Sequence, residues 1–151
     1  MRRHVPSLVL MLFASVAGVL YAQQPQPSGS SGRPTLDYDY FKSRVQPILG
    51  ATRPGHTRCV TCHAKFPAPG FHMEAPGPNG TWTEAQTRQN FEAVSRRVVP
   101  GDVARSRLLR HPLRSEAGGD QFHFGGKHWD SPNDPEWQIL YAWVVGKKPT
   151  S

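Results

Sequence analysis

Cysteine is scarce in this sequence, which has two Cys among 151 residues. Both lie in one short segment, at Cys59 and Cys62, and no second Cys pair exists elsewhere. A structural zinc site draws on four Cys or His ligands in paired spacing, so histidines would have to complete such a site here. The candidates for that alternative are His72, His111, His123 and His128.

Long hydrophobic runs are also missing. The apolar run over residues 8–20 is shorter than the roughly 20 residues that cross a bilayer as a helix. It follows the basic start Met1-Arg2-Arg3-His4 and precedes Ala22, a small residue suited to signal-peptidase cleavage. This order predicts a secretory signal over residues 1–22, with an uncleaved membrane anchor as the alternative. No Cys lies near residue 22, so a lipoprotein anchor is not expected either. From the signal pattern we expect export to the periplasm, with no membrane span after cleavage.

Acidic residues are in the minority, 11 against 18 Lys and Arg, and the formal net charge is +7. The basic residues are scattered and do not interleave with aromatic residues in a stripe, so nucleic-acid binding is not expected. A positive surface suits docking to an acidic partner protein, because charge mainly steers the encounter of two proteins. A solvated basic surface without a partner is the alternative.

The alternating pattern typical of strands is absent, whereas helical spacing recurs four times. A Pro- and Gly-containing linker over residues 23–35 precedes one predicted domain over 36–147 and a short tail over 148–151. Thr83 with Gln86 makes a capping-box pattern, and Asp134-Pro135 is typical of a helix start. The sequence predicts a small all-α domain with long Pro/Gly-rich loops over 64–82 and 111–133, and helices over 37–49, 83–98, 103–110 and 134–146.

The segment Cys59-Val60-Thr61-Cys62-His63 carries the clearest chemical signal. Two thiols separated by two residues match the two vinyl groups of haem, and the His that follows is placed to bind the iron, which is how C-x-x-C-H is interpreted. We expect one covalent haem c on Cys59 and Cys62, with His63 as the proximal axial ligand of the iron. A thioredoxin-like redox pair would need a strand-to-helix context, and a disulfide across two residues would be strained.

Segments around this motif resemble the planctomycete-type cytochrome c domain, a branch of the class I c-type cytochrome fold. The resemblance implies an electron carrier whose first and last helices cross and pack beside the haem. That contact would join Phe41 and Val45 to Trp137, Leu140 and Tyr141. The similar segments are residues 40–49, 59–63, 90–91, 99–102, 106–109 and 135–144.

The wider class I pattern has a Met-Pro before the last helix, and its Met is the second axial ligand of the iron. This sequence lacks that Met-Pro. After residue 22 the only Met is Met73, ten residues beyond His63 and too early to reach the other haem face. The resemblance instead maps a His-x-Gly-Gly segment onto His123, which implies that His123 is the distal iron ligand. The alternatives are His111, His128, Met73 and an open iron, while His56 and His72 receive no role.

Electron transfer to and from a redox partner protein is therefore the expected function. A second His in place of Met would make it a carrier of lower potential. The buried aromatics expected to keep the haem pocket dry are Trp82, Phe91, Trp137 and Tyr141. A haem-based module that binds or senses a small ligand is the main alternative. An enzyme is not expected, since a di-haem peroxidase needs a second C-x-x-C-H, and a phosphate loop, nucleophile elbow and paired zinc-binding histidines are absent.

Overall fold

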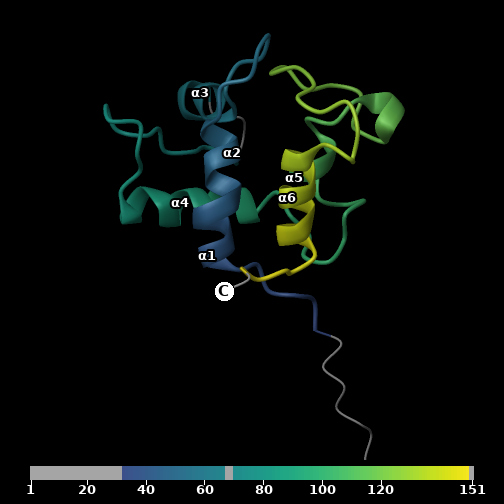
Figure 1. The fold of residues 1–151 in the computed structure, drawn as a ribbon, viewed down its shortest axis with the longest axis horizontal. Helices are drawn as coiled ribbons and strands as arrows, with labels where there is room; N and C mark the ends of the chain where they lie inside the picture. The colour runs from purple at the N-terminus through teal and green to yellow at the C-terminus, as the bar shows by residue number, and fades with distance from the viewer. Residues whose placement is uncertain (1–31, 67–69, 150–151) are drawn as a thin grey trace, which may run out of the picture. The chain divides into compact units, whose positions relative to one another are not determined.

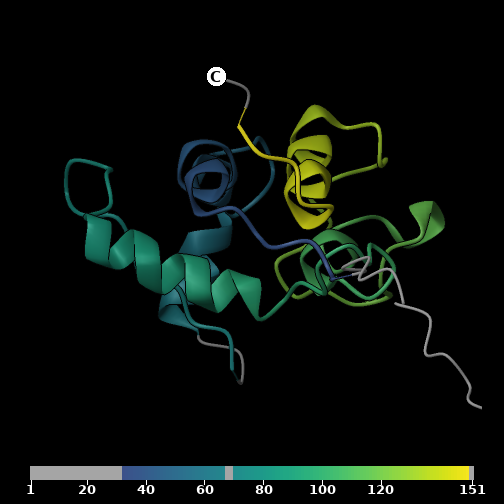
Figure 2. The same ribbon diagram turned by 90° about the horizontal axis from the view of Figure 1, so that it is seen from below.

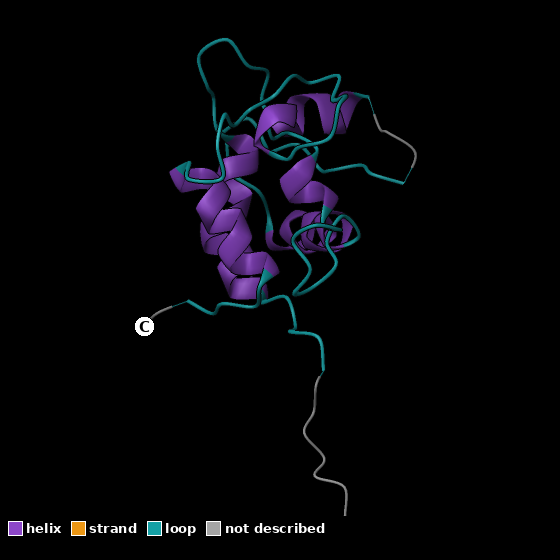
Figure 3. Ribbon diagram, turned by 90° about the vertical axis from the view of Figure 1, so that its right-hand side faces the viewer, coloured by secondary structure: helices purple, strands orange, loops and turns teal. Residues whose placement is uncertain are grey.

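The computed structural model describes residues 32–66 and 70–149, and the predicted secretory signal of residues 1–22 lies outside them, as does most of the predicted linker. Gly32–Ser151 forms one compact unit, which includes the predicted domain of 36–147. Its described residues are helical and contain no strand (Figure 3), only isolated bridges such as Arg53 with His56. The predicted all-α class is confirmed. Among the described residues, no helix is long and apolar enough to cross a membrane.

The first helix forms where it was predicted, but with a wide turn inside it. It comprises α1 (Tyr38–Tyr40), a π-helical turn η1 (Phe41–Val45) and α2 (Gln46–Gly50), which follow one another without a break. The Asp37 side chain caps its start by accepting from the Tyr40 amide at 2.7 Å. The wide turn ends two residues before Pro47, whose ring would clash with the carbonyl four residues earlier in a regular α-helix.

Two further helices confirm their predicted starts. Helix α4 (Glu84–Ser95) begins with a complete capping box between Thr83 and Gln86, and it ends earlier than predicted. Helix α6 (Pro135–Val144) begins with the Asp134 carboxylate accepting from two backbone amides. Gly146 follows α6 with a φ of 81°, a left-handed conformation that ends a helix most readily at glycine.

Two elements correct the sequence prediction. A helix α3 (Cys59–Lys65) contains the Cys and His motif, a segment that was not predicted to be helical. The predicted helix over 103–110 is reduced to α5 (Arg107–Arg110), because Asp102 caps only the turn at Arg105 and the Ser106 hydroxyl bonds to the carbonyls of Val99 and Asp102. A short 3-10 turn, η2 (Ser115–Ala117), interrupts the second predicted loop.

The first helix and α6 lie side by side and form the centre of the core (Figures 1 and 2). Phe41 packs against Trp143 with ring centroids 5.4 Å apart, and both side chains are fully buried. The Trp143 indole also donates to the Asp37 carbonyl at 2.8 Å. The resemblance implied contact between these helices, and the α6 ring that packs on Phe41 is Trp143, a residue that was not named in that expectation. Phe91 brings α4 against the same cluster, 5.5 Å from Phe41.

Candidate haem-binding site

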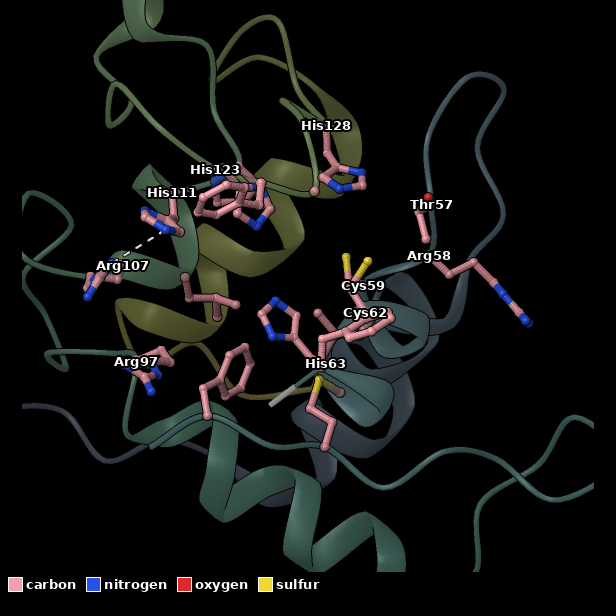
Figure 4. A pocket seen from close by; sticks show the side chains of 18 of the residues that line it. Thr57, Arg58, Cys59, Cys62, His63, Arg97, Arg107, His111, His123 and His128 are labelled. Carbon is pink, nitrogen blue, oxygen red and sulfur yellow. Dashed lines mark hydrogen bonds between the residues drawn. The ribbon is translucent and has the colours of Figure 1, made fainter. Parts of the chain in front are cut away.

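A cavity of about 820 Å³ lies beside α3, at the upper end of the size range of cofactor sites. Helix α3 forms one wall with Cys59, Cys62 and His63, and the loop between α5 and α6 forms the facing wall with His123 and His128 (Figure 4). The structure therefore brings together residues that are far apart in the sequence.

Both thiols lie at one edge of this cavity. Cys59 and Cys62 are three residues apart on α3, so their side chains project from one face of the helix. Both are free thiols, so the disulfide alternative is not seen here. Burial raises the pKa of Cys59. Helix α3 follows a loop, whereas the thioredoxin-like alternative requires a strand before the helix.

His63 forms the floor of the cavity directly after the second thiol. Its ring lies 4.3 Å from the Phe71 ring, centroid to centroid, and its carbonyl accepts from the Met73 amide at 3.1 Å. Burial lowers the pKa of His63 to about 4, so the ring is neutral at pH 7. A neutral imidazole is the form that binds a metal.

His123 faces His63 across the cavity. The two ring centroids are 6.4 Å apart and the ring planes are 17° from parallel. His123 Nδ1 lies 2.6 Å from the Gly126 carbonyl oxygen, and because a carbonyl only accepts, Nδ1 carries the proton of this bond. Burial also lowers the pKa of His123. In the neutral ring, Nε2 therefore keeps its lone pair, and a carbonyl-bound Nδ1–H is the usual arrangement of a metal-binding His.

The loop that carries His123 is fastened at both ends by charged side chains. At its start, the Asp120 carboxylate bonds to His111 Nδ1 at 2.9 Å and to Arg110 at 2.7 Å. Burial opposes ionisation of Asp120, but the bond from His111 and the charge of Arg110 outweigh it and lower the Asp120 pKa. At its end, Lys127 Nζ donates to the carbonyls of His111 and Asp120. We call Arg110, His111, Asp120 and Lys127 the loop clasp.

The other candidate ligands also line the cavity, in different settings. His111 is engaged in the loop clasp, with its Nε2 3.4 Å from Arg107. His128 is buried, and burial lowers its pKa to about 4. Met73 is fully buried and its amide donates to the His63 carbonyl, so it lies next to His63.

The two other histidines among the described residues, His56 and His72, do not line the cavity. His56 stands with its ring 5.0 Å from that of His128, and His72 lies 3.7 Å from Glu74. Across residues 32–66 and 70–149, no three or more His, Cys, Asp or Glu side chains form a group that could hold a metal ion by themselves, as the zinc alternative requires.

The aromatic lining differs from the prediction. None of the four aromatics expected to line the pocket does so; Trp137 instead donates from its indole to the Leu109 carbonyl at 3.1 Å, within the core. Helix caps and apolar spacing identify residues that face the core, but they do not identify which of them face a cavity. The aromatics that do line it are Phe66, Phe71, Phe124 and Trp129. Of these, Phe66 and Phe124 are exposed, at 76% and 111% of the reference area of the whole residue.

Comparison with known proteins adds no relative. No family model, curated protein or solved structure matches this chain.

Proposed function

We propose that this protein is an exported mono-haem c-type cytochrome that carries electrons between redox partners and is not an enzyme. The observation that carries the proposal is the facing pair His63 and His123, set directly beside the two thiols of Cys59 and Cys62. The proposal includes a fold of the class I cytochrome type, in agreement with the contact between the first helix and α6.

The spacing of the two imidazoles supports one metal ion between them. A bond from zinc to an imidazole nitrogen is about 2.0–2.1 Å, and the ring centroid lies about 1.1 Å behind that nitrogen. Two imidazoles on opposite sides of one ion of similar bond length would thus have centroids about 6.3 Å apart. The observed 6.4 Å agrees with that arrangement, whereas ligands at a tetrahedral angle would be closer.

The cavity also suits a large apolar group held at its edge. The exposed rings of Phe66 and Phe124 line the cavity, and exposed apolar groups at a concave surface are typical of a binding site. Two thiols at one edge fit covalent attachment to two vinyl groups. These features are independent of the histidine spacing, and both favour haem.

When bound, haem iron supplies a one-electron ferric–ferrous couple. In the proposed function, Cys59 and Cys62 would retain the group, and His63 on α3 would hold its iron. His123, whose ring is oriented by its bond to the Gly126 carbonyl, would also hold the iron and would close the site to external ligands. Two imidazole ligands give a lower potential than a His–Met pair. The excess of basic side chains supports docking to an acidic redox partner, and export to the periplasm is part of the proposal.

The test is to co-express the full chain with a haem-attachment system and record its visible spectrum, oxidised and reduced. Covalent haem that survives denaturation and low-spin iron that is reversibly reduced are expected. Cys59→Ala with Cys62→Ala should abolish attachment, while Thr61→Ala, a spacer change on the same helix, should retain it. A spectrum that does not respond to reductant would contradict the carrier function. Tight carbon monoxide binding by the reduced protein would instead indicate the ligand-binding alternative.

A further inference from the structure

The cavity has chemically different ends. The thiols of Cys59 and Cys62 lie at one end, and the guanidinium groups of Arg97 and Arg107 lie at the opposite end, with His63 between them (Figure 4). Burial lowers the pKa of Arg97, and the positive charge of the nearby Arg107 lowers it further. Two cations that repel each other at the edge of a cavity form a site in which an anion would be stabilised.

Arg97 is held in place by an aromatic ring. Its guanidinium lies 5.1 Å from the centroid of Phe71, and the same ring packs on His63. Arg107 comes from the first turn of α5, and its guanidinium is 3.4 Å from His111 Nε2. The two cations therefore reach the cavity from different segments and converge on the end that is remote from the thiols of Cys59 and Cys62.

We infer that Arg97 and Arg107 form a carboxylate subsite that binds the two propionate groups of the haem. This inference rests on the proposed function. The propionates of haem project from the edge of the macrocycle opposite its two vinyl groups, so a haem attached at Cys59 and Cys62 presents its carboxylates toward the arginine end. Guanidinium is the side chain best suited to pair with a carboxylate through two parallel hydrogen bonds.

In the proposed subsite Arg97 and Arg107 have two roles, although neither belongs to the motif from Cys59 to His63. They fix the rotation of the cofactor in the cavity, since only one edge is anionic. They also neutralise two negative charges close to the iron. Without that neutralisation the ferric state, which carries one more positive charge, would be favoured and the reduction potential would fall.

The test compares Arg97→Gln and Arg107→Gln in the haem-loaded full chain with Arg58→Gln. Arg58 is a matched control because it lines the same cavity at the thiol end, and its side chain points away from it (Figure 4). Each arginine variant is expected to raise the ferric-to-ferrous ratio about tenfold at fixed ambient potential, which corresponds to a midpoint lower by 59 mV for one electron. The control should change that ratio less than twofold.

A second readout reports the carboxylates directly. The propionate bending bands in the resonance Raman spectrum should shift in Arg97→Gln and Arg107→Gln and stay fixed in the control. Unchanged bands in both arginine variants, or equal potential shifts in all three proteins, would overturn the subsite. Arg107 is exposed, so its variant keeps the test valid if Arg97→Gln fails to fold. Failure of the proposed function is distinguishable, because the wild type would then contain no covalent haem.

Discussion

The imidazole rings of His63 and His123 lie 6.4 Å apart, centroid to centroid, and within 17° of parallel, although their positions in the sequence differ by sixty. A nearly parallel pair at this distance leaves room for one atom bound to both. Helix α3 fixes the first ring and the loop clasp, together with the Gly126 carbonyl, fixes the second.

Removing the His123 ring should open the iron on one side. In the haem-loaded protein, His123→Ala is expected to convert low-spin iron to high-spin iron in the electron-spin spectrum. His111→Ala, His128→Ala and Met73→Ala should each leave it low-spin, because His111 is bonded to Asp120 and Met73 lies on the His63 side. If Met73→Ala alone changed the spectrum and a methionine-to-iron charge-transfer band were lost, the distal assignment would be wrong.

Loosening the loop clasp should weaken the distal ligand without removing it. In Asp120→Asn, the charge that holds His111 and Arg110 is lost, so the loop should release His123 more often. We expect added cyanide to bind the ferric protein about tenfold faster, as measured by stopped-flow absorbance. This factor corresponds to roughly 1.4 kcal/mol, slightly less than the roughly 1.5–3 kcal/mol that a hydrogen bond to a charged group contributes.

A matched control lies later in the same loop region. Asp130 pairs with Arg114 and is exposed, and neither residue belongs to the loop clasp. Asp130→Asn should therefore bind cyanide at the wild-type rate. An equal acceleration in Asp120→Asn and Asp130→Asn would indicate a general charge effect on an anionic ligand and would contradict a positioning role for Asp120.

The contact between the first helix and α6 should dominate the stability of the fold. Phe41→Ala removes a fully buried ring and is expected to reduce the free energy of unfolding by about 3–5 kcal/mol, the usual cost of such a cavity. Trp143→Phe keeps most of the packing but loses the indole bond to the Asp37 carbonyl. Its free energy of unfolding should therefore fall by less than that of Phe41→Ala. Urea denaturation followed by circular dichroism would measure both. A smaller loss for Phe41→Ala than for Trp143→Phe would contradict this view of the core.

The capping box of α4 gives a smaller, local prediction. Thr83→Ala removes the side-chain oxygen that accepts from the Gln86 amide, and an N-cap of this kind contributes about 1 kcal/mol. Thr83→Ser retains the hydroxyl and should unfold at nearly the wild-type urea concentration. Equal losses of stability in the two variants would show that the Thr83 methyl group, and not the hydroxyl cap, stabilises the fold.

Sequence patterns predicted the elements that carry their own start signals. Helices α4 and α6 begin at caps that are visible in the sequence, at Thr83 and Asp134. Helix α3 was missed because its N-cap residue, Arg58, makes no side-chain cap bond and its first turn contains the β-branched Val60 and Thr61, which are poor helix formers. What makes this segment helical is its packing, since Val60 is buried in the core.

The candidate site was only partly accessible from the sequence. Cys59, Cys62 and His63 follow from one local motif, whereas spacing alone does not distinguish His123 from His111 or His128. The bond from His123 Nδ1 to Gly126, and the opposed rings, depend on how a long loop folds back over α3. The same is true of Arg97 and Arg107, whose convergence on one end of the cavity has no counterpart in any sequence motif.

Helix α3 and the loop clasp belong to separate stretches of the chain, and this has a consequence for how such a protein can change over evolutionary time. Under the proposed function, the five residues from Cys59 to His63 secure the cofactor on their own through two covalent bonds and one ligand. The loop around His123 would then be free to vary, exchanging one ligand for another or opening the iron, while the cofactor stays attached. One scaffold could in this way yield carriers of different potential, or ligand-binding descendants, by alteration of a single loop.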